Sequence, residues 1–137
     1  MNRVRYTLDG ASFENLEGFY LALDHELLAG ESWGHNLDAL DDVLAGAYGS
    51  VPAEFTLVWR DADISRERLG YDVTVRELCH RLAHCDVTNV LTVAQQLRAA
   101  LRREGPTVFD WILDLIRAHP NVELVLQPEP RNGARDV

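Results

Sequence analysis

The sequence predicts an α/β domain in which helices pack on a small three-stranded parallel sheet. Three short apolar segments, at residues 4–8, 54–59 and 122–126, have the length and composition of strands. Segments with apolar residues at helical spacing separate them along the chain. Strands that are joined through helices favour parallel pairing with right-handed crossovers, so we expect a single sheet with the helices packed against it.

The first strand and the first helix are marked by their own patterns. Residues 4–8 alternate between apolar and polar side chains and end at an Asp-Gly turn signal. Residues 15–28 then predict a helix, because apolar side chains recur there every four positions (Phe19, Leu23, Leu27).

A second helix is expected to begin at Asn36, a favourable N-cap residue. Leu37, Leu40 and Leu44 would form its core-facing side. The apolar run EFTLVW that follows predicts a buried strand. The polar residues 60–70 predict a loop or a short helical turn.

Residues 71–105 are predicted to form an inserted pair of helices, because two apolar stripes at helical spacing run through them. Thr107 and Asp110 have the spacing of a capping box, which predicts the start of a late helix that is apolar over most of its surface. We therefore expect a single domain over residues 1–127. The polar residues 128–137, rich in Pro and Gly, predict a disordered tail.

Charge and cysteine content limit the possible partners. The 137 residues include 22 acidic and 13 basic ones, a formal net charge of −9. A field of this sign attracts basic partners and repels nucleic acids and anionic membranes, so we expect no direct nucleic acid and no membrane partner.

The chain starts without an apolar signal-peptide core and has no run that could span a bilayer. Cys79 and Cys85 would lie roughly 9 Å apart along one helix, too far for a disulfide. These features predict a cytoplasmic protein with reduced thiols.

An acidic cluster lies on the second predicted helix. Asp38, Asp41 and Asp42 are spaced three and four residues apart, so they share one side of the helix and leave the other side to leucines. Like charges at this spacing destabilise a helix by roughly a few tenths of a kcal/mol per pair. Short acidic runs on exposed helices are common, so the cluster by itself does not identify a binding site.

The segment SWGHNLDALDD, residues 32–42, resembles the signature of the barstar family of ribonuclease inhibitors. In that family an aromatic residue and a glycine precede Asn-Leu-Asp-Ala-Leu, and a second acid follows on the same helix. Trp33, Asn36, Asp38 and Asp42 occupy these positions here. Three other features occur in the same order as in that family: an early Asp-Gly turn, a strand ending in Trp-Arg, and a late helix that leads into the last strand. The resemblance implies a barstar-like fold, with the helical pair as an insertion that the smallest members lack.

The resemblance implies a protein that is not an enzyme. Such a protein binds a basic extracellular-type ribonuclease one to one and blocks its active site with carboxylates that mimic RNA phosphate. The dominant phosphate mimic is then Asp42, and the second key acid is Asp38. No cofactor and no metal are implied. The other expected partner contacts are Asn36, Asp41, Gly46, Asp114 and Trp33.

The chain departs from the family pattern at Ser32, Asp41 and Ala47, where the family has aromatic residues. These departures remove apolar contact area and leave a more acidic surface. The departures affect which nuclease the protein binds and the affinity of the complex.

Two other interpretations stay open. The sequence CHRLAHC at residues 79–85 places His80 and His84 one turn apart, where they could share a zinc ion, but ordinary helix packing is favoured because the two cysteines point elsewhere. The same scaffold could also bind a different basic toxin or a cellular protein, because a fold does not fix a function. No spacing of acids, bases or nucleophiles predicts catalysis.

Overall fold

The computed structural model describes residues 4–28, 33–46 and 51–127. Within these ranges, three strands form one parallel sheet in the order β1-β2-β3, which confirms the predicted α/β fold class. The central strand β2 has its first five residues buried, as expected for a continuous apolar run. The strands are β1 (Val4–Asp9), β2 (Phe55–Arg60) and β3 (Val122–Leu126).

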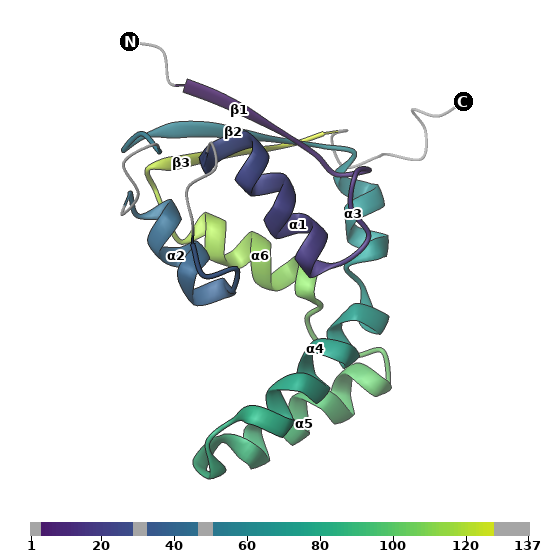
Figure 1. Cartoon of the computed structure of the whole chain (residues 1–137). Helices are drawn as coiled ribbons and strands as arrows, with labels where there is room; N and C mark the ends of the chain where they lie inside the picture. The colour runs from purple at the N-terminus through teal and green to yellow at the C-terminus, as the bar shows by residue number, and fades with distance from the viewer. Residues whose placement is uncertain (1–3, 29–32, 47–50, 128–137) are drawn as a thin grey trace, which may run out of the picture.

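Three helices lie together on one side of the sheet (Figure 1): α1 (Leu16–Leu23), α2 (Leu37–Leu44) and α6 (Val108–Arg117). The main core fills the space between these helices and the sheet. At its centre the rings of Phe19 and Phe109 contact the fully buried Trp59, with centroid distances of 5.5 and 5.3 Å. The first predicted helix is present, but its last turn is a π-helix, η1 (Asp24–Leu28).

The segment at residues 60–70 is more regular than its polar sequence predicts. It contains a seven-residue helix, α3 (Ala62–Arg68), in place of the expected loop or short helical turn. Ser65 in this helix is fully buried. Its hydroxyl donates to the Gly10 carbonyl at 2.9 Å and accepts from the indole Nε1 of Trp59 at 2.9 Å. These bonds join α3 to the turn after β1, and no local pattern could reveal them.

The predicted helical pair is a hairpin that projects away from the sheet (Figure 1). It consists of α4 (Tyr71–His84), a short 3-10 turn η2 (Val87–Asn89) and α5 (Val90–Leu101). The hairpin has a small apolar cluster of its own, to which Trp111 of α6 contributes. At its base, the buried Thr74 hydroxyl accepts a hydrogen bond from the Val108 amide at 2.8 Å. The base of the hairpin is therefore attached to the start of α6.

Several features predicted from short stretches of sequence can be compared with the described residues. Thr107 and Asp110 form the predicted capping box at the start of α6. Cys79 and Cys85 are free thiols, as expected. Among the described helices, none has the length and apolar character needed to cross a membrane. Outside the described residues lie the predicted tail at 128–137 and the family departures Ser32 and Ala47.

Candidate protein-binding site

Helix α2 carries the predicted acidic cluster, and hydrogen bonds fix both of its ends. At the start, Asn36 is the N-cap, and its side-chain oxygen accepts from the Ala39 amide at 2.7 Å. At the end, the side-chain amide of Asn121 donates to the Leu44 carbonyl at 2.9 Å. A helix held in this way loses little conformational freedom when a partner docks on it.

The apolar side of α2 agrees with the predicted pattern in most respects. Leu40 and Leu44 are buried in the main core, and Val43 joins them. Leu37 is only partly buried and packs at the edge of this core. The helix therefore has one face in the core and one face toward solvent.

The three aspartates of α2 differ in their contacts. Asp38 and Asp42 are exposed, and within the described part of the chain neither carboxylate makes a hydrogen bond or an ion pair. Asp41 instead lies against His119, two residues after the end of α6, with its Oδ1 at 2.7 Å from the His119 Nε2. Two of the three carboxylates are thus available to a partner, and the third is attached to the fold.

No feature of the sequence predicted the contribution of His119. Its side chain is mostly buried, at 13% exposure, and its contact with Asp41 joins residues 78 positions apart. No spacing or motif in the chain relates these two residues. Only the packing of α2 against α6 brings them together.

Trp33 lies at the edge of the core and not on an open surface. It is 9% exposed, its indole N–H donates to Asp24, and its ring meets Tyr20 edge-on at 5.4 Å. The neighbouring His35 ring places its Nε2 at 2.8 Å from Asp24 and its Nδ1 at 3.2 Å from Glu17. These contacts orient the segment that leads into α2. A direct contact between Trp33 and a partner stays a prediction.

The remaining predicted contacts lie on exposed positions next to α2. Asp114 is exposed on α6, the helix that packs beside α2 (Figure 1). Asp110, one turn earlier, is partly buried because it completes the capping box. Gly46 follows α2 and is exposed, with φ +91°, a backbone conformation that favours glycine.

Exposed carboxylates on a fixed helix are suited to bind basic side chains. A carboxylate can accept two parallel hydrogen bonds from one arginine, as a phosphate does. Asp38 and Asp42 are one helical turn apart, so their Cβ atoms are about 5–6 Å from each other and both can reach one basic cluster. The arrangement favours recognition of a cationic protein surface.

His80 and His84, the alternative considered for zinc, have no further ligands in the part of the chain that the structure describes. The rings of His80 and His84 lie 4.4 Å apart, between centroids. Within residues 4–28, 33–46 and 51–127, no three His, Cys, Asp or Glu side chains group as a set that could hold a metal ion.

Comparison with known protein families identifies a match over more than half of the chain. A family model described as "Barstar (barnase inhibitor)" matches residues 4–90. The match includes β1, α1, α2, β2, α3 and α4, and therefore the acidic cluster of α2. No curated protein matches the chain.

Proposed function

Because this chain belongs to the barstar family, we propose that it is a cytoplasmic inhibitor that binds a basic, microbial-type ribonuclease one to one. In this proposal the Asp42 carboxylate occupies the position of an RNA phosphate, and Asp38 reaches the same basic cluster from one turn away. Asn36, Gly46 and Asp114 contribute contacts around them. The chain catalyses no reaction, and it acts by blocking the active site of its partner.

The observation that carries this proposal is the exposure of Asp38 and Asp42 on a helix whose ends are both fixed. Two like charges one turn apart destabilise the helix that bears them. Within the described residues no hydrogen bond or ion pair offsets this cost. A basic partner would offset it, because its cations would lie between and beside the two carboxylates.

The active site of a ribonuclease offers the complementary chemistry. It binds phosphate, and arginine, lysine and histidine side chains are the groups that bind phosphate well. A carboxylate that is already in place can replace the phosphate there, because both anions accept bidentate hydrogen bonds from a guanidinium. Since the fixed helix loses little conformational freedom on docking, more of the electrostatic attraction remains as affinity.

The first prediction is that the protein suppresses RNA cleavage by at least one small basic ribonuclease. Cleavage of a fluorescent RNA should fall as the chain is titrated, with full inhibition near one equivalent. An unrelated protein of similar net charge serves as the control for nonspecific attraction. If no member of a panel of basic ribonucleases is inhibited or bound, the ribonuclease proposal is wrong, and a different basic toxin or cellular protein becomes the favoured partner.

The second prediction concerns salt. The formal net charge of −9 should steer a basic partner toward the protein, and salt screens exposed charges beyond about 10 Å at 0.1 M ionic strength. The association rate, followed by stopped-flow mixing, should therefore fall by about tenfold or more from low to high salt. The dissociation rate should change much less. An association rate that does not respond to salt would mean that the acidic surface does not guide the encounter.

A further inference from the structure

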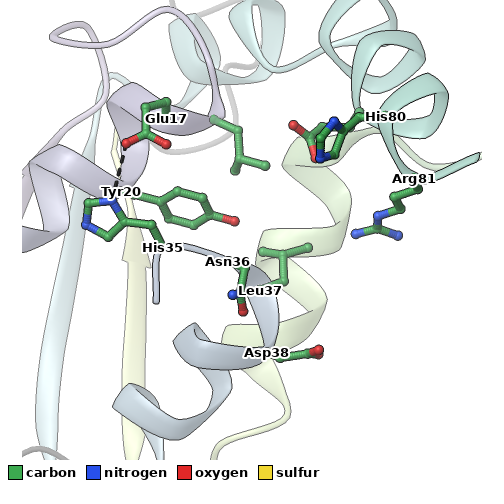
Figure 2. A pocket seen from close by; sticks show the side chains of 10 residues that line it. Glu17, Tyr20, His35, Asn36, Leu37, Asp38, His80 and Arg81 are labelled. Atoms are coloured by element: carbon green, nitrogen blue, oxygen red, sulfur yellow. Dashed lines mark hydrogen bonds and ion pairs between the residues drawn. The ribbon is translucent and has the colours of Figure 1, made fainter. Parts of the chain in front are cut away.

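A cleft of about 540 Å³ lies beside the acidic cluster, between α1, the start of α2 and α4 (Figure 2). Three carboxylates from three different elements line it: Glu17 from α1, Asp38 from α2 and Glu77 from α4. The cleft therefore continues the exposed face of α2 onto the helical hairpin. Its volume is within the range of sites that bind small ligand groups.

Tyr20 lines this cleft with a side chain that is largely buried. The residue is only 4% exposed, and its ring packs against those of Trp33 and His35. Its hydroxyl points into the cleft (Figure 2). Among the described residues the hydroxyl has no hydrogen-bond partner, and its oxygen is open to the cleft, since no buried side-chain oxygen or nitrogen there is left unpaired. A group that enters the cleft could bond to this hydroxyl in place of water.

The charges around the hydroxyl favour a cation as that group. Burial raises the pKa of Tyr20 above its usual range, and the nearby Glu77, Glu17 and Asp38 carboxylates add to the effect, while Arg81 opposes it. The guanidinium of Arg81 already lies over the Trp111 ring, at 4.7 Å from its centroid. Glu17 is paired with His35, and His80 also lines the cleft. The carboxylates of Asp38 and Glu77 make no hydrogen bond or ion pair among the described residues, so they are available to a cation.

We propose that this cleft receives one basic side chain, an arginine or a lysine, from the protein that docks on α2. The inference rests on the proposed function and extends its interface from α2 onto α4. The cation would donate hydrogen bonds to the Tyr20 hydroxyl oxygen and lie among the carboxylates of Glu17, Asp38 and Glu77. Because Glu77 belongs to the hairpin, the hairpin would help to select among basic ribonucleases.

The test begins with small probes, so that it does not depend on knowing the nuclease. N-acetyl-arginine methylamide is titrated into the full chain while the Tyr20 ring signals are followed by NMR. The neutral citrulline analogue and inorganic phosphate are titrated in parallel. The arginine probe should shift these signals in a saturable way, whereas the other two should not. Glu77→Gln should weaken its binding by about fivefold, and Glu104→Gln, which changes an exposed acid that does not line the cleft, should not.

Tyr20→Phe keeps the packed ring and removes the hydroxyl, so it should also weaken binding of the arginine probe. The proposal is overturned if the arginine probe does not bind, if phosphate binds in its place, or if Glu77→Gln binds the probe as the wild type does. It is also overturned if a ribonuclease is inhibited and Glu77→Gln and Tyr20→Phe bind it with unchanged dissociation constants. If the probe binds but no ribonuclease is inhibited, the cleft is supported and only the identity of the partner is wrong.

Discussion

Asp42→Ala should weaken binding to the inhibited ribonuclease by about 2–5 kcal/mol, the same range as is expected for Asp38→Ala. In the proposed complex the Asp42 carboxylate pairs with desolvated cations of the nuclease, and its removal leaves them buried and unpaired. The range includes the values for charged contacts in a ribonuclease–inhibitor complex of the same family. Folding stability should not fall, because Asp42 is exposed and its loss relieves repulsion from Asp38.

Asp41→Ala is the matched control, since it removes the same charge from the adjacent position. The contact with His119 draws the Asp41 carboxylate toward α6, so its loss should mainly slow association and change affinity by less than about 1 kcal/mol. Asp41 is half exposed, and breaking its pair with His119 should cost little stability. The loss of affinity caused by Asp114→Ala should lie between those caused by Asp41→Ala and Asp42→Ala, because the Asp114 contact is peripheral.

Dissociation constants and thermal midpoints of these three variants and of Asp38→Ala test the ranking. Asp38→Ala should resemble Asp42→Ala, because both carboxylates are exposed and unpaired within the described residues. A folded Asp42→Ala protein that binds like the wild type would contradict the proposed interface. An unfolded one would show that Asp42 supports the fold and not the partner.

Ser65→Ala should destabilise the fold strongly and leave affinity for the ribonuclease unchanged. The hydroxyl is fully buried and joins the Trp59 indole N–H to the Gly10 carbonyl, at 2.9 Å each. Alanine removes both bonds, and each buried polar group left unpaired costs about 1–3 kcal/mol. Urea denaturation should therefore show a much lower midpoint with a similar slope.

Ser12→Ala is the control for this substitution. The Ser12 hydroxyl also donates to a backbone carbonyl near the same turn, that of Asp9, but Ser12 is exposed. Water can replace this bond, so the midpoint should move little. Equal midpoints for Ser12→Ala and Ser65→Ala would show that the buried bridge contributes nothing. A loss of affinity in folded Ser65→Ala would show that α3 influences the interface.

Short stretches of sequence were enough to predict the elements whose causes are local. Asn36 and Thr107 begin their helices through bonds to backbone amides three residues away, so a short stretch of sequence contains the whole signal. The aspartates of α2 share one side because of helical periodicity alone. The three strands were recognisable as apolar runs between helical segments, and their parallel pairing followed from the order of elements. The resemblance to the matched family also rested on a contiguous motif, residues 32–42.

The contacts of individual side chains depend on how the helices and strands pack, and no local pattern predicted them. Asp41 and Asp42 are neighbours with the same chemistry, but the end of α6 places His119 against only one of them. Residue 65 lies in a polar segment that predicted a loop or a short helical turn, yet its hydroxyl is buried between residues 10 and 59. The cleft at Tyr20 exists because α4 lies across from α1. Each of these contacts joins residues that are far apart in the chain. It forms only because core packing sets the positions of whole helices, and local sequence patterns contain no information about those positions.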